Sequence, residues 1–241
     1  MVVVPDLRMS HEERVGVIAD HCAFFAGLAE DDLAADVPGC PGWSVEDVLR
    51  HVAAFSASCR AWCQTSDLGD VNPMVFNMAR MAEVQQLPLE ALVPELDAYR
   101  ACLANLDADA PVYGHLGVET AGWQSWHCAA EWGVHRHDVE VGLGRPSSLT
   151  GDRAFDAVMW TIEYAYPMVL QFRGLESFPA VRLVSEADGL DHVAGAGAAS
   201  ASLSGTAQDL VLHLWRRPHG PVIIEGDPVA AREYSGLAAG R

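Results

Sequence analysis

Apolar residues recur every three or four positions through much of the first 142 residues, which is the pattern of helices that pack one face against a core. The first such stretch follows Ser10, whose hydroxyl can cap a helix, and continues to about Leu28. Ser44 and Asp47 have the spacing of a capping box, so a second helix is expected from there to about Cys63.

Further helices are expected in the same half of the chain, separated by polar or glycine- and proline-containing segments. A plain loop is expected between the last two of them. Because the connections are short, the pattern predicts an up-down four-helix bundle, with one more helix beside it. The expected ranges are Met74–Gln86, Leu89–Leu106 and Trp123–Gly142.

The pattern changes after a linker-like segment near residues 145–151. A helix is expected over Asp152–Gln171, and then short apolar runs alternate with turn signals such as Asp188-Gly189. This half is predicted to be α+β, with a short, mostly antiparallel sheet. We therefore assign residues 1–147 to a helical domain and 148–241 to an α+β domain. Strands are expected at Val181–Ser185, Leu190–Ala194, Ala199–Leu203 and Val222–Glu225, and helices after Thr206 and Asp227.

Composition narrows the class of protein. Half of the residues are apolar, which is enough for a sizeable core. The formal charge of −18 argues against binding to nucleic acid or to an anionic membrane surface. No apolar run is long enough to span a bilayer, and no signal peptide is recognisable, so we expect a cytoplasmic protein, either a monomer or a homodimer. The six cysteines form no CxxC pair and are interpreted as reduced thiols.

One segment carries side chains suited to metal binding. Glu131 and His135 are four residues apart, so on a helix they lie on one face and can approach the same point. His51 adjoins the buried stripe of the second expected helix and could supply a third ligand. Imidazole and carboxylate donors without thiolates suit zinc or another first-row divalent ion. In a chain with ten histidines, the same spacing also arises by chance.

Neighbouring polar residues leave several alternatives open. His127 lies one turn before Glu131, where it could be a fourth ligand, a partner of a ligand, or an ordinary helix residue. Asp138 follows His135 by three residues and could accept its N–H, or could simply be solvated at the helix end.

Two motifs resemble those of the mycothiol-dependent maleylpyruvate isomerase family, among the DinB/YfiT-like metal-binding bundles. The first is the CPGW turn and helix of Cys40–Val52, and the second is the EWGVHRHD segment of Glu131–Asp138. Gly205–Arg217 and Ile224–Pro228 resemble the family's C-terminal domain, which is similar in fold to sterol carrier proteins. The resemblance implies zinc ligands at His51, Glu131 and His135, and mycothiol as a thiol cofactor or cosubstrate. The absence of lysine fits a high-GC actinobacterium, in which mycothiol is the main small thiol.

The chemistry that follows from this resemblance is thiolate chemistry. A zinc-bound thiol is deprotonated, so an open zinc position can present a thiolate to a small electrophile. Addition to a conjugated cis double bond, rotation and loss of the thiol give an isomerase; a retained adduct gives an S-transferase. The alternatives are a thiol- or ligand-binding regulatory protein and a metal-dependent hydrolase.

An anionic substrate would need a counter-charge, and every basic residue of this chain is an arginine. The candidates for this catalytic role are Arg80, Arg136 and Arg217, with Arg216 beside the last of these. Each of them could instead form a surface ion pair.

Overall fold

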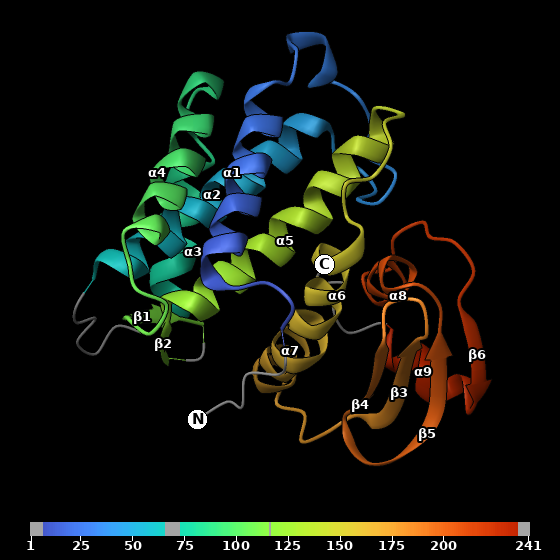
Figure 1. Cartoon of the computed structure of the whole chain (residues 1–241). Helices are drawn as coiled ribbons and strands as arrows, with labels where there is room; N and C mark the ends of the chain where they lie inside the picture. The colour runs from blue at the N-terminus through green and yellow to red at the C-terminus, as the bar shows by residue number, and fades with distance from the viewer. Residues whose placement is uncertain (1–6, 66–72, 116, 236–241) are drawn as a thin grey trace. The chain divides into compact units, whose positions relative to one another are not determined.

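The computed structural model describes residues 7–65, 73–115 and 117–235. The chain divides into two compact units (Figure 1). The helical unit is Met9–Ser148, and the α+β unit is Leu149–Arg241 together with the N-terminal segment that ends at Arg8. This division gives each unit its own core.

The described residues of the helical unit form five α-helices, α1 to α5, and the starts of α1 and α2 follow local sequence signals. Ser10 accepts a hydrogen bond from the Glu13 amide at 3.2 Å, and Ser44 accepts one from the Asp47 amide at 3.3 Å, which completes a capping box at each helix start. Short 3-10 turns at Glu30–Asp32 and Leu89–Ala91 join the helices. The bounds are α1 His11–Ala26, α2 Val45–Gln64, α3 Pro73–Val84, α4 Leu92–Ala104 and α5 Ala121–Gly142.

The segment expected to be a plain loop before α5 contains a β-hairpin instead. Strands β1 (Pro111–Gly114) and β2 (Gly117–Thr120) pair antiparallel. Their four-residue lengths are too short to show the alternating pattern that marks a strand in sequence. The hairpin packs against α2 and α5.

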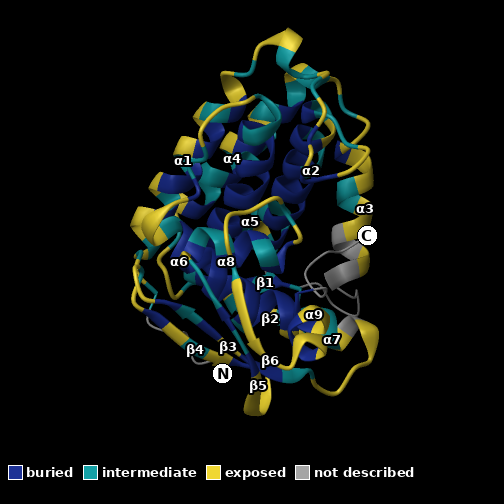
Figure 2. Ribbon diagram, turned by 90° about the vertical axis from the view of Figure 1, so that its right-hand side faces the viewer, coloured by how far each residue is buried: buried dark blue, intermediate teal, exposed yellow. Residues whose placement is uncertain are grey.

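The core of the helical unit lies between the inward faces of α1, α2, α4 and α5, where buried residues follow each helix (Figure 2). Large side chains fill it, among them Phe25, Trp62, Leu96 and Trp132, each 2% exposed or less. Burying a side chain of this size contributes about 1.5 to 3 kcal/mol. The apolar periodicity thus places the polar exceptions on α2 and α5 inside the bundle.

In the α+β unit, α6 (Gly151–Trp160) continues through a π-helical turn (Thr161–Ala165) into α7 (Tyr166–Arg173). The sheet order is β4-β3-β5-β6; the β3–β4 and β5–β6 pairs are antiparallel, and the β3–β5 pair is parallel. The expectation of an α+β half with a mostly antiparallel sheet is therefore confirmed. The remaining bounds are β3 Pro179–Ser185, β4 Leu190–Ala194, β5 Ala196–Ser204, α8 Ala207–Leu214, β6 Ile223–Gly226 and α9 Pro228–Tyr234.

Arg8, near the start of the described residues, contacts helix α6 of the α+β unit. Its backbone N–H donates to Asp156 at 3.0 Å, its guanidinium pairs with Asp152 at 3.3 Å, and it lies 3.9 Å from the centre of the Phe155 ring. Several contacts therefore join Arg8 to α6.

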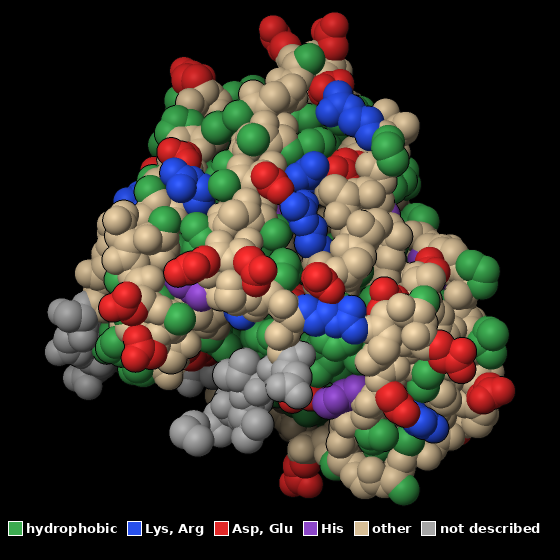
Figure 3. Space-filling model, in the orientation of Figure 1, with side chains coloured by type: hydrophobic (Ala, Val, Ile, Leu, Met, Phe, Trp, Pro, Cys, Tyr) green, Lys and Arg blue, Asp and Glu red, His purple; other side chains and the backbone are tan. Residues whose placement is uncertain are grey.

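Charged side chains are dispersed on the face drawn in Figure 3, where red acidic groups lie among isolated blue arginines. None of the helices in residues 7–65, 73–115 and 117–235 combines the length and hydropathy that crossing a bilayer requires.

Candidate metal site

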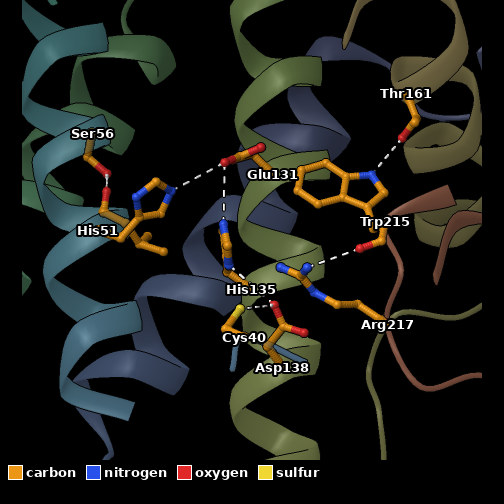
Figure 4. Close-up of polar contacts among 10 residues, drawn as sticks. Cys40, His51, Ser56, Glu131, His135, Asp138, Thr161, Trp215 and Arg217 are labelled. Carbon is orange, nitrogen blue, oxygen red and sulfur yellow. Dashed lines mark hydrogen bonds and ion pairs between the residues drawn. The ribbon is translucent and has the colours of Figure 1, made fainter. Parts of the chain in front are cut away.

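Helices α2 and α5 bring three sequence-predicted residues together inside the bundle. His51 lies on α2, and Glu131 and His135 lie one turn apart on α5 (Figure 4). Glu131 Oε1 is 3.5 Å from His51 Nε2 and 3.4 Å from His135 Nε2. One donor atom from each residue lies within 4.8 Å of the others. The arrangement is therefore compact enough for one ion to contact all three side chains.

A second group supports His135 from its other side. Asp138 Oδ2 lies 3.3 Å from His135 Nδ1 and also accepts from the Cys40 thiol at 3.3 Å. Because Asp138 can accept the proton on Nδ1, it favours the tautomer in which Nε2 of His135 carries the free lone pair. Of the two alternatives for Asp138, the structure thus shows the contact with His135 and not a solvated side chain at the helix end.

The tight turn before α2 explains how Cys40 reaches this position. Val37 N–H donates to the Trp43 carbonyl at 3.0 Å, and Trp43 N–H donates to the Cys40 carbonyl at 2.9 Å. Gly42 has φ +86°, a left-handed conformation that side chains other than glycine rarely adopt. Trp43 then lies over the site, with its ring centre 5.3 Å from that of His51.

The electrostatics of the cluster follow from its contacts. Burial opposes the charge of Glu131, but hydrogen bonds from His135 and His51 hold its pKa well below the usual value. Burial also opposes a charge on His135, but Asp138, Cys40 and Glu131 together raise its pKa well above the usual value. The cluster therefore stabilises positive charge next to an ionised carboxylate, which is the environment that a cation requires.

Exposure shows from which side a small molecule can approach. The side chain of His51 is 24% exposed, whereas those of Glu131 and His135 are 12% and 6% exposed. The cluster is therefore open to solvent on the α2 side and closed on the α5 side.

His127 points into a different environment. Its ring packs between Phe55 and Trp123, with centres 4.9 and 5.2 Å away, and lies 5.3 Å from the His115 ring. Burial lowers the pKa of His127 to about 3 and that of His115 to about 4. Among the described residues, neither histidine belongs to a group whose donor atoms converge as those around Glu131 do.

The three candidate arginines have other contacts within their own units. Arg80 pairs with Glu83 at 2.7 Å on α3. Arg136 pairs with Glu140 at 2.8 Å and lies over Phe24 of α1. The third, Arg217, is in the α+β unit and donates to the Trp215 carbonyl at 3.0 Å. Neither Arg80 nor Arg136 has a hydrogen bond or ion pair to the three-residue cluster among these contacts.

Two further residues lie near the cluster without a sequence signal for this position. Cys40 belongs to a turn motif in sequence, but its thiol contacts Asp138 across 98 positions of sequence. His115 follows strand β1, which has no recognisable pattern in the sequence. A histidine next to glycine in a short hairpin gives no local signal that would have identified it.

The fold and this cluster define the class: a DinB-like helical bundle with a histidine–carboxylate group between two helices, joined to an α+β domain. Residues 17–140 match the family model described as the mycothiol maleylpyruvate isomerase N-terminal domain. The chain belongs to that family.

Two solved structures share the architecture of the chain. One, described as the mycothiol-dependent maleylpyruvate isomerase, is 17% identical, covers 91% of this chain and 95% of its own, and gives a TM-score of 0.62. A mutant of that enzyme is 16% identical, covers 85% of this chain and 88% of its own, and gives a TM-score of 0.59. At these identities the likeness establishes the fold alone. No protein with a curated functional description matches the chain.

Proposed function

We propose that the protein is a mycothiol-dependent isomerase whose divalent metal ion, zinc in our assignment, is held by His51, Glu131 and His135. The observation that carries the proposal is the convergence of these donors within 4.8 Å in a chain of this family. In this proposal, residues 1–147 form the metal-binding domain and 148–241 the α+β domain of a cytoplasmic actinobacterial enzyme, a monomer or homodimer.

The donor set fits such an ion on chemical grounds. Two imidazole nitrogens and one carboxylate oxygen are ligands that zinc accepts, and three protein ligands leave a position for a further group. The ionised Glu131 offsets part of the ion's charge. When bound, ion and small thiol together would supply a thiolate, whose reversible addition to a conjugated cis double bond allows rotation about that bond.

The protein's own residues prepare this site. Asp138 holds the Nδ1 proton of His135, so that Nε2 is presented toward Glu131. Trp43 covers the side of His51 and limits the entry of water, while the partial exposure of His51 leaves room for a small molecule. The buried α5 side keeps the carboxylate fixed, which lowers the cost of organising the site when a ligand arrives.

For an anionic substrate, Arg80, Arg136 and Arg217 remain our candidates for charge recognition. Arg80 is easily released, because its partner Glu83 is 66% exposed and an ion pair in solvent contributes little. Arg136 is more firmly held, since its partner Glu140 is 4% exposed and also accepts from the Ser148 amide. Replacing each arginine by alanine should raise KM more than it lowers kcat if the residue binds substrate.

The test is thiol dependence. Maleylpyruvate, the substrate named for the solved relatives, is offered to zinc-loaded protein with and without mycothiol. The proposal expects isomerisation only when the thiol is present. Equal turnover without any thiol, or no turnover with it, contradicts the proposal.

A further inference from the structure

Four cysteines lie on helices α2, α4 and α5, and two of them differ from the others in exposure. Cys59 and Cys128 are fully buried. Cys63, in the last turn of α2, and Cys102, in the last turn of α4, are both partly exposed and free. Small molecules can therefore reach only the second pair directly.

The packing of α2 against α4 sets these two cysteines side by side. The Cys59 thiol is hydrogen-bonded to the Tyr99 hydroxyl. One turn further along both helices, the thiols of Cys63 and Cys102 interact with each other. An ion pair between Arg60 and Glu95, 2.6 Å long, holds the same two helices together. The two cysteines therefore lie next to each other because of the way α2 and α4 pack along their lengths.

The surroundings of Cys102 favour its thiolate. The interaction with Cys63, together with the nearby charge of Arg60 and against the effect of burial, lowers the pKa of Cys102 to about 7. By contrast, burial raises the pKa of Cys22 to about 12 and that of Cys59 well above its usual value. A partly exposed, partly ionised thiol next to a second thiol has the features of a reactive cysteine pair.

We propose that Cys63 and Cys102 form a redox-active thiol pair that reacts with small disulfides and closes into a disulfide between α2 and α4. The Cys102 thiolate attacks one sulfur of a disulfide RSSR, forms a mixed disulfide and releases RS⁻. Cys63 then loses its proton to solvent and attacks the Cys102 sulfur, which breaks the mixed disulfide and releases a second RS⁻. Two protein thiols are oxidised and one small disulfide is reduced.

Closure requires the sulfur atoms to move from contact to bonding distance, and their position allows this. Cys63 is one residue and Cys102 two residues from the end of its helix. Helix ends have fewer intrahelical hydrogen bonds than helix interiors and adjust more easily. The pair is separate from the metal cluster, so this inference stands or falls independently of the proposed isomerase activity.

The test uses reduced full-length protein, bis(2-hydroxyethyl) disulfide as the probe, and peptide mapping by mass spectrometry without reduction. Cleavage after Arg60 separates the two cysteines of α2, and cleavage after Glu119 separates Cys102 from Cys128. We expect one intramolecular disulfide, between the peptides that contain Cys63 and Cys102. Random modification of all the cysteines, or no product, overturns the proposal.

Two variants and a control separate the steps. Cys63→Ser should accumulate the mixed disulfide on Cys102, and Cys102→Ser should react at least about tenfold more slowly than wild type. Cys22→Ser, which removes a buried thiol of raised pKa, should still form the disulfide. Circular dichroism checks that each variant is folded. If Cys102→Ser reacts as fast as wild type, the assignment of the attacking thiol is wrong, and the wild-type peptide map decides the pairing even if a variant fails to fold.

Discussion

His135 and His127 lie on the same helix, α5, eight residues apart, and they are tuned in opposite directions. Against the effect of burial, His135 gains Asp138, Cys40 and Glu131 as partners, and its pKa is raised. Burial lowers the pKa of His127 to about 3, and its ring lies among Phe55, Trp123 and His115. Both histidines are almost fully buried, so the difference arises from partners rather than from depth.

This contrast explains why the region around Glu131 and His135 suits a cation, whereas the region around His127 and His115 does not. Around Glu131, carboxylates compensate the charge that burial would otherwise exclude. Around His127, aromatic rings supply little compensation, and the imidazoles stay neutral at physiological pH. Two histidines of one helix therefore have opposite charge preferences because of the side chains that each one touches.

The largest expected effect concerns His115 and His127, the two buried histidines whose pKa values are lowered. The pKa values of His115 and His127 fall from 6.5 to about 4 and about 3, so the unfolded chain binds more protons than the native one below pH 6.5. Stability should therefore decrease as pH falls from 6.5, by up to about 3 kcal/mol for His115 and about 5 kcal/mol for His127 once pH lies below each lowered pKa. Urea unfolding of wild type, His115→Gln and His127→Gln at several pH values measures how steeply the free energy of unfolding changes with pH. The slope should be smaller in each variant.

The measurement should stay between pH 6.5 and about 5.5, above the range in which the carboxyl groups of the unfolded chain titrate. The raised pKa of His135 does not interfere, since its contribution to stability is complete below the unfolded value of 6.5. If the stability of both variants depends on pH as steeply as that of wild type, His115 and His127 do not have lowered pKa values, and the contrast with His135 is wrong.

The next effect concerns the partner of His135. Asp138→Asn keeps the size of the side chain but removes its charge, so zinc affinity should fall about 10- to 100-fold. Glu140→Gln is the matched control, because Glu140 is another buried carboxylate of α5 that pairs with Arg136 instead. Competition with a chromogenic chelator gives the affinities. A larger loss in Glu140→Gln than in Asp138→Asn would show that Asp138 has no special role.

The smallest effect concerns Cys40, whose thiol is a weak donor to Asp138. Cys40→Ala should weaken zinc binding about two- to fivefold, and Cys40→Ser, which restores a donor, should bind within about twofold of wild type. The same chelator assay measures both variants. If Cys40→Ala and wild type bind zinc with equal affinity, Cys40 does not help to position His135, and Asp138 alone has that role.

The sequence predicts the features of this molecule that depend on neighbouring residues. The capping boxes at Ser10 and Ser44 and the apolar periodicity locate the helices, because these interactions span only a few positions. The His51, Glu131 and His135 grouping came from helical spacing and from two recognisable motifs. Whether the grouping binds metal remains a prediction.

The remainder depends on contacts that spacing cannot show. The thiol of Cys40 meets Asp138 only after the bundle has folded, and Cys63 meets Cys102 only through the register of α2 against α4. The β1–β2 hairpin was expected to be a loop because its strands are too short for a pattern. Long-range packing, rather than local preference, determines these features.

Metal content tests the central claim most directly. After incubation with zinc and removal of the excess, wild type and the surface variant His213→Ala should each retain one equivalent per chain, whereas His51→Ala and Glu131→Ala should retain little. Inductively coupled plasma mass spectrometry measures all four proteins in parallel. Stoichiometric zinc in both His51→Ala and Glu131→Ala, or none in wild type, would contradict the proposed site.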